Sequence, residues 1–202
     1  MAPGMNWEKG LAAEGAGGAL VDGGALVGRT LGALGVRHLF AINGGHTFPI
    51  LAALREHGVM LVHMRHEQAC AYAADAYARA SGRVGVCSVT AGCGLTNAVT
   101  GLALAAQTGS AVVCIAGQHP TTEDGLGSFQ EAYGVEICGS FAKYAKRVLD
   151  WSAIEFDLRQ AFRAAHSAPQ GAALVEIPTN ILYHQADAAQ QRRGAAVYAP
   201  EA

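Results

Sequence analysis

A carboxylate stands where an apolar, strand-like run gives way to a long helix-favouring stretch. The apolar run covers residues 59–62, and the charged tripeptide Arg65-His66-Glu67 leads from it into an alanine-rich segment that ends at Ala80. A helix N-terminus favours the ionised form of a carboxylate, because the helix dipole places partial positive charge there. Glu67 could therefore be a simple capping residue or, in a cleft, an acid or base that handles a proton.

The side chains around Glu67 that could bind a metal ion are His63, His66 and Cys70. Residues four apart on a helix lie on one face, so His66 and Cys70 would be neighbours. The helical zinc-protease pattern would need a second histidine at position 70, where this chain has cysteine. Metal binding is thus an open alternative, and we predict no metal ligand in this chain.

A small-residue turn, Gly92-Cys93-Gly94, also separates an apolar run from a helical pattern. A dinucleotide-binding turn would need a third glycine at position 97, where the chain has Asn97, and an acid about 20 residues later. Cys93 could act as a nucleophile, since a helix N-terminus stabilises a thiolate, but the flanking glycines of a nucleophile elbow are missing. Small residues at such a turn also let the backbone approach a neighbour or a ligand closely.

The composition is that of a globular chain with a sizeable core: 202 residues, 51% hydrophobic and 15% charged. A net charge of −2 gives no reason to expect nucleic acid or an anionic membrane as a partner. Five cysteines without a Cys-x-x-Cys pair predict reduced, buried thiols in a cytoplasmic protein. No run reaches the roughly 18 apolar residues of a membrane span, and the first 20 residues do not read as a signal peptide.

Helical and strand patterns alternate along the chain. Helices are predicted at residues 22–34, 49–56, 67–80, 95–106 and 152–166, with Asp22 and Ser152 as N-caps of the first and last. Strands are predicted at 36–42, 59–64, 84–89, 111–116, 146–149 and 172–177, with one helical turn at 130–135. This alternation predicts an α/β fold, a doubly wound parallel sheet of about six strands with helices on both faces.

The domain organisation follows from the same pattern. Residues 1–20 are glycine- and alanine-rich and are predicted to be a flexible N-terminal segment. Residues 21–184 form the predicted domain, and residues 185–202 a polar tail. The carboxyl ends of parallel strands meet at one edge of a sheet. We therefore expect the turns at 43–47, 90–94 and 117–120 to lie beside Glu67.

Together these segments resemble the pyrimidine-binding, N-terminal domain of thiamine-diphosphate-dependent enzymes, and most closely the acetolactate synthase group. The resemblance runs from about Asp22 to Leu182. It rests on short motifs in the family's order, namely Leu34-Gly35-Val36, Asn43-Gly44-Gly45, Arg65-His66-Glu67-Gln68-Ala69, Tyr77-Ala78-Arg79-Ala80-Ser81-Gly82, Thr90-Ala91-Gly92-Cys93-Gly94-Leu95-Thr96-Asn97, Gly117-Gln118, Phe129-Gln130-Glu131, Lys143-Tyr144-Ala145 and Val175-Glu176-Ile177-Pro178.

The resemblance implies a role for each of these turns. Glu67 would hydrogen-bond the pyrimidine nitrogen N1′ of thiamine diphosphate and drive formation of the cofactor ylid, which attacks a 2-keto acid. The implied catalytic residues are Glu67, Gln130 and His46. The implied cofactor-binding residues are Glu67, Asn43, Gly44, Gly45, Gly92, Cys93 and Asn97, and the implied substrate pocket contains Gln118, His119 and Phe129.

Asn43, His46 and Cys93 depart from the family pattern, which usually has proline at positions 43 and 93 and a small or apolar residue at 46. A histidine beside the reacting centre could serve as an acid–base group or alter the choice of substrate. It could equally be an ordinary turn histidine at the surface.

The family's second signature, Gly-Asp-Gly followed by Asn, binds the diphosphate through Mg²⁺ and does not occur in this sequence. The nearest run, Glu123-Asp124-Gly125, lacks the context. The resemblance therefore implies the α subunit of a split enzyme in an α₂β₂ assembly, whose partner chain holds Mg²⁺ and the diphosphate. The expected activity is decarboxylation, carboligation or both on a small 2-keto acid. Cleavage of a 2-hydroxyacyl thioester, simple decarboxylation, a non-catalytic partner role and a thiol hydrolase built on Cys93 remain alternatives.

Overall fold

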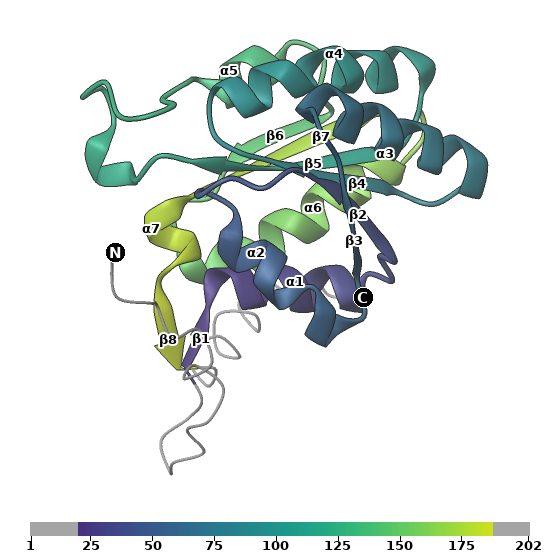
Figure 1. Cartoon of the computed structure of the whole chain (residues 1–202). Helices are drawn as coiled ribbons and strands as arrows, with labels where there is room; N and C mark the ends of the chain where they lie inside the picture. The colour runs from purple at the N-terminus through teal and green to yellow at the C-terminus, as the bar shows by residue number, and fades with distance from the viewer. Residues whose placement is uncertain (1–19, 188–202) are drawn as a thin grey trace.

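Six parallel strands form the central sheet of the computed structural model, which describes residues 20–187 of the chain. The strand order is β3-β2-β4-β5-β7-β6 (Figure 1). The strands are β2 (His38–Ala41), β3 (Met60–His63), β4 (Gly85–Val89), β5 (Val112–Gln118), β6 (Tyr144–Arg147) and β7 (Ala172–Pro178). Every neighbouring pair is parallel, which confirms the predicted sheet.

Helices cover both faces of this sheet (Figure 1). One face packs against α1 (Gly23–Ala33), α2 (Phe48–Ala53) and α6 (Ile154–His166). The other packs against α3 (Glu67–Ser81), α4 (Cys93–Thr108) and α5 (Gly134–Gly139). Each face has its own cluster of buried apolar side chains, so the doubly wound α/β architecture is confirmed. No helix among residues 20–187 combines the length and the apolar character needed to cross a membrane.

The helix that begins with Glu67 is anchored at both ends. His66 is its N-cap, and its Nδ1 accepts a hydrogen bond from the Gln68 backbone N–H at 3.2 Å. Gly82 ends the helix in the left-handed conformation, φ +68°, which glycine adopts without strain. Small residues on the buried face, including Ala71 and Ala74, let α3 lie close to the sheet and α4. This close packing fixes the first turn of α3, and with it Glu67, at the carboxyl edge of the sheet.

Three local predictions need correction. The helical turn expected at 130–135 forms instead at residues 134–139, because Gln130 has φ +60°, which ends any right-handed helix there. The strand expected at 146–149 lies at 144–147. Ser152 does not cap the last long helix, α6, whose N-cap position is Ala153 and carries no side-chain hydrogen bond. Asp150 instead caps the 3₁₀ turn Trp151–Ala153 that leads into α6, and it accepts a hydrogen bond from the Ser152 backbone N–H at 2.8 Å.

A second, two-stranded sheet joins the two ends of the described chain. In it β1 (Leu20–Asp22) pairs antiparallel with β8 (Gln185–Asp187), and Leu20 lies opposite Asp187. A short helix, α7 (Thr179–Leu182), leads from β7 to β8. Residues 185–187, assigned by sequence to the polar tail, thus form a strand. The rest of that tail and residues 1–19 lie outside the described residues.

Asp22 caps α1 as predicted: its Oδ1 accepts a hydrogen bond from the Ala25 backbone N–H at 2.7 Å. Replacing Asp22 by alanine leaves that N–H without its partner and should lower the free energy of unfolding by about 1 kcal/mol. Urea denaturation measures the change. Glu56→Ala, at an exposed carboxylate without a cap contact, is the control; equal stability of the Asp22→Ala variant and the wild type would contradict the capping role.

Candidate active site

The turns that follow four strands meet at the carboxyl edge of the sheet, as expected from parallel topology. The turns after β2, β3 and β4 carry His46, Glu67 and Thr90 respectively, and the long connection after β5 carries Gln130. Contacts between these segments show that they form one constellation rather than four separate turns.

Glu67 is the half-buried acid of this constellation. Its Oε2 accepts a hydrogen bond from Asn97 Nδ2 at 3.1 Å, which joins the first turn of α3 to α4. Its Oε1 has no hydrogen-bond partner among residues 20–187 and lies 3.6 Å from the place that a Cβ at Gly94 would occupy. Asn97 therefore orients the carboxylate and leaves one oxygen available to a donor from outside the chain.

Thr90 lies at the centre of the site, although the sequence did not single it out. Its Oγ1 is 3.0 Å from His46 Nδ1 and 3.5 Å from Gln130 Oε1. A Cβ at Gly44 or at Gly94 would lie 2.4 or 2.6 Å from the Thr90 side chain. Two of the glycines in the site are thus required by the close approach of Thr90, and its place at the head of the Thr90-Ala91-Gly92 motif was the only available signal.

Gln130 closes the site over the start of α4. It is the only non-glycine residue with positive φ in the described part of the chain, and its Nε2 donates a hydrogen bond to Cys93 Sγ at 3.0 Å. Gly92 has φ +53°, and a Cβ there would lie 2.2 Å from the Gln130 carbonyl oxygen. Residue 92 must therefore be glycine, because the Gln130 backbone occupies the space of any side chain.

The turn after β2 brings an imidazole and an aromatic ring together. The rings of His46 and Phe129 are stacked, with centroids 6.2 Å apart and planes inclined by 14°. Burial lowers the pKa of His46, and the nearby His119 lowers it further. Tyr183 donates a hydrogen bond from its hydroxyl to the Gly45 carbonyl oxygen at 3.1 Å and so fixes the turn. Asn43 is exposed beside these residues.

The side chains of Gln118 and His119 line a neighbouring cavity of about 360 Å³. Gln118 is buried, and its Nε2 donates to the Ala132 carbonyl oxygen at 2.8 Å and to Glu176 Oε1 at 3.2 Å. His119 stands between Gln118 Oε1 and Asp124 Oδ1, each 2.7 Å from a ring nitrogen. Of the predicted substrate pocket, Phe129 stacks on His46, whereas Gln118 and His119 form hydrogen bonds with the loop that carries Phe129. His119 is still close enough to lower the pKa of His46.

Metal binding near Glu67 finds no support in the geometry. Across residues 20–187 no group of three or more His, Cys, Asp or Glu side chains is arranged to hold a metal ion. Cys70 is buried inside α3, and His66 is engaged as the helix cap.

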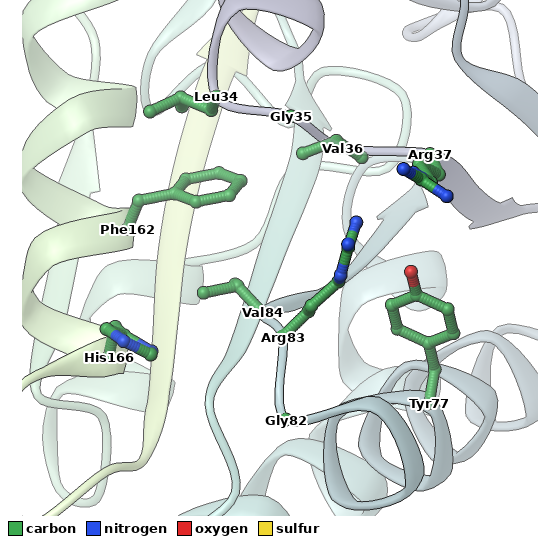
Figure 2. A pocket seen from close by; sticks show the side chains of 10 residues that line it. All are labelled: Leu34, Gly35, Val36, Arg37, Tyr77, Gly82, Arg83, Val84, Phe162 and His166. Carbon is green, nitrogen blue, oxygen red and sulfur yellow. The ribbon is translucent and has the colours of Figure 1, made fainter.

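A second cavity, of about 330 Å³, opens at the opposite, amino-terminal edge of the sheet. Figure 2 shows Arg83 reaching across it towards Arg37, with Phe162 on the other side. None of the predicted site residues lines this cavity.

Comparison with known proteins identifies a family for this chain. Residues 21–137 match the model of the family "Thiamine pyrophosphate enzyme, N-terminal TPP binding domain". The chain is 37% identical over 155 residues to the acetolactate synthase large subunit IlvG of Mycobacterium tuberculosis, covering 77% of this chain and 28% of that protein. It is 38% identical over 161 residues to human 2-hydroxyacyl-CoA lyase 2, covering 80% of this chain and 26% of the lyase. For acetolactate synthase 2 of Zea mays the identity is 45% over 148 residues, which is 73% of this chain and 23% of the maize protein.

The chain thus spans about a quarter of the length of these relatives. The matched part contains the strands and turns that hold Glu67, Thr90, Cys93 and Gln130. This chain belongs to the family of N-terminal, thiamine-pyrophosphate-binding domains of thiamine-pyrophosphate enzymes.

Proposed function

We propose that this chain is the pyrimidine-binding part of a thiamine-diphosphate-dependent enzyme that acts on a 2-keto acid, with Glu67 as its proton-handling carboxylate. The observation that carries the proposal is the hydrogen bonding of the Glu67 carboxylate. Asn97 holds one carboxylate oxygen, and the other has no partner among residues 20–187. A carboxylate oriented in this way at the carboxyl edge of the sheet suits proton exchange with a bound ring.

The surrounding residues fit the pyrimidine ring of the cofactor. A side chain at position 94 would point at Thr90 and Glu67, so the glycine there keeps the approach to Glu67 Oε1 free. Glu67 would exchange a proton with ring nitrogen N1′, and the backbone at Gly44 and Gly45 would line the same side. Thiamine diphosphate, when bound, supplies a nucleophilic carbon for attack on a keto group.

The remaining residues of the site would act on the substrate. His46 has a lowered pKa and is therefore neutral near pH 7, which lets its imidazole accept a proton. Its Nδ1 faces Thr90, so the opposite ring nitrogen is the one that could meet a substrate. The Gln130 amide, held beside Cys93, offers further hydrogen-bonding groups to a substrate.

Two reactions are compatible with this arrangement. Our first candidate is decarboxylation or carboligation of a small 2-keto acid, supported by the relatives named acetolactate synthase. The second is cleavage of a 2-hydroxyacyl thioester, supported by the equally similar relative named 2-hydroxyacyl-CoA lyase 2. The same proton handling by Glu67 would serve both.

We also propose that a partner supplies the diphosphate- and Mg²⁺-binding part, in an α₂β₂ assembly. The 202 residues given contain no Gly-Asp-Gly sequence, so the diphosphate- and Mg²⁺-binding part would have to come from outside them. The half-buried Glu67 and the exposed Asn97 and Cys93 would then lie at the interface between the two chains.

Reconstitution tests both proposals. The chain is assayed alone and with the protein that co-purifies with it, in thiamine diphosphate and Mg²⁺, for consumption of pyruvate and for cleavage of a 2-hydroxyacyl-CoA. We expect turnover only with both chains present. Tight cofactor binding and turnover by the chain alone would overturn the split arrangement, and the absence of both reactions from the complex would overturn the proposed activity.

A further inference from the structure

The connection between β5 and α5 carries Phe129 and Gln130 over the site but contains little regular structure of its own. Its one regular element is a 3₁₀ turn at Thr121–Glu123. A connection of this length is mobile unless side chains hold it. The question is therefore which residues fix it to the sheet.

The first half of the connection is held at Asp124. Arg147 on β6 donates two hydrogen bonds to this carboxylate, at 3.0 and 2.7 Å. His119 Nε2 lies 2.7 Å from the same group. The bidentate contact with Arg147 lowers the pKa of Asp124, so the carboxylate is ionised wherever the protein is folded near neutral pH.

The second half folds back on the first through Glu131. Its carboxylate accepts hydrogen bonds from the backbone N–H groups of Gly125, Gly127 and Ser128, at 2.6, 2.9 and 3.1 Å. These contacts, chiefly that of Gly125, lower the pKa of Glu131. The connection is thus a closed loop, but Glu131 alone does not attach it to the sheet.

Glu176 makes that attachment from within the sheet. It is 2% exposed, in the middle of the buried strand β7. It accepts a hydrogen bond from Gln118 Nε2 at 3.2 Å and another from the Val135 backbone N–H. The same Gln118 amide donates to the Ala132 carbonyl oxygen. A Cβ at Gly134 would lie 2.0 Å from Glu176 Oε1, so the start of α5 rests directly on the carboxyl group.

Burial and the neighbouring groups shift the pKa of Glu176. Burial raises its pKa to about 7, while Arg147 and the Gln118 hydrogen bond lower it and Glu136 raises it. Cys138 on α5 also faces the carboxylate. The other ionisable groups that line the adjoining cavity are His119, Asp124, Glu131, Tyr133 and Lys146.

We propose that Glu176 is a positioning residue of the active site: through Gln118 and the backbone of residues 132–135 it holds the Phe129–Gln130 segment over His46, Thr90 and Cys93. The inference rests on the proposed function for its effect on turnover. Its structural part, the placement of Gln130 against Cys93, stands on the contacts alone.

Protonation of Glu176 changes the hydrogen bonds that its carboxyl group can accept. The ionised carboxylate accepts from both Gln118 and Val135, whereas the protonated group loses acceptor capacity and presents an O–H to one of them. Because the pKa is raised to about 7, the accepting form prevails above that pH and is lost below it. The hydrogen bonds that Glu176 accepts from the segment should therefore change as the pH passes through about 7.

Cys93 provides a readout that does not depend on activity. The chain has five cysteines, of which Cys70, Cys87, Cys114 and Cys138 are buried and Cys93 alone is exposed. Gln130 donates to its sulfur, so loss of the segment from its place changes access to this one thiol. The rate of reaction with a small disulfide reagent is measured on the full chain of the wild type, Glu176→Gln and Glu176→Ala.

We expect the Cys93 reaction to be faster in both variants, by about tenfold in Glu176→Ala, and less so in Glu176→Gln, which keeps one acceptor oxygen. In the active complex kcat should fall by on the order of tenfold to a hundredfold, as expected for a misplaced contact group, and any change in wild-type activity that follows titration of Glu176 near pH 7 should be absent from Glu176→Gln. Glu56→Gln, which removes an exposed carboxylate far from Glu176, is the control and should match the wild type.

Unchanged Cys93 reactivity in Glu176→Gln would overturn the positioning role, even if the variant were less stable. Faster Cys93 reaction with unaltered kcat and pH profile in an active complex would overturn the link to catalysis. If the wild-type complex has no thiamine-dependent activity, the proposed function fails, and the thiol measurement still decides whether Glu176 holds the segment. Should Glu176→Ala not fold, Glu176→Gln carries both measurements.

Discussion

Glu67→Gln should reduce turnover by on the order of a thousandfold and leave the fold unchanged. Glutamine keeps an oxygen that can accept the hydrogen bond from Asn97 Nδ2, now 3.1 Å from Glu67 Oε2. It cannot take up or release a proton, so the exchange assigned to Glu67 is lost while its shape is kept. Steady-state kcat of the assembled enzyme with pyruvate or a 2-hydroxyacyl-CoA measures the effect.

The matched control is Glu56→Gln, an exposed carboxylate in the 3₁₀ turn Arg55–His57. It makes the same chemical change away from the site and should leave kcat as in the wild type. The thermal midpoint of both variants should stay within a few degrees of the wild type. Normal kcat in pure Glu67→Gln enzyme would remove Glu67 from the proposed mechanism.

Gly92→Ala should damage both stability and activity. The backbone of Gly92 has φ +53° and ψ −106°, a conformation that an L-residue adopts only with strain, and the new Cβ would lie 2.2 Å from the Gln130 carbonyl oxygen. Strain and clash together should lower the free energy of unfolding by about 2–4 kcal/mol. The displaced Gln130 should also cost more than about tenfold in kcat. Urea denaturation and steady-state kinetics check the two effects.

Gly139→Ala is the comparison variant, since a Cβ there meets nothing within 4 Å and no positive φ is required. It should leave stability nearly unchanged. If Gly92→Ala were as stable and active as Gly139→Ala, the contact between the α4 turn and the Gln130 backbone would not exist in solution.

The alternation of apolar runs with helical patterns was enough to predict the sheet and the long helices. The runs at β5 and β7 are buried along their whole length, as the central strands of a parallel sheet must be. Gly82 and Gly109 end α3 and α4 in the left-handed conformation, and such glycines can be recognised from sequence alone. In these elements the structure favoured by the local sequence is the same as the structure required by packing, so they could be predicted.

Prediction failed where tertiary contacts decide the local structure. The three-residue strands β1 and β8 have no alternating pattern and exist because they pair with each other across the domain. The α5 helix starts at Gly134 because a buried carboxyl group from β7 meets its first turn. In each of these contacts the two partners are far apart in the sequence. A local sequence pattern therefore could not predict the strands or the start of α5.

In the candidate site, too, some residues could be predicted from the sequence and others could not. Glu67, Asn97 and Gln130 were all assigned from the motifs in which they stand, and the structure brings them to one edge. Their individual roles remain predictions. Thr90 and Glu176 were overlooked, although a single acid inside the apolar run 172–177 is a recognisable signal that a buried carboxyl group has a partner.

The pairing of β1 with β8 has a topological consequence. Because Leu20 lies opposite Asp187, the first and last described residues of the chain lie side by side, so the described part forms a nearly closed ring (Figure 1). Circular permutants, in which the present ends are joined and the chain is opened at another loop, should therefore keep the same contacts. A ring of this kind can be placed within a longer polypeptide, or stand beside a separate one, without moving the edge that carries Glu67.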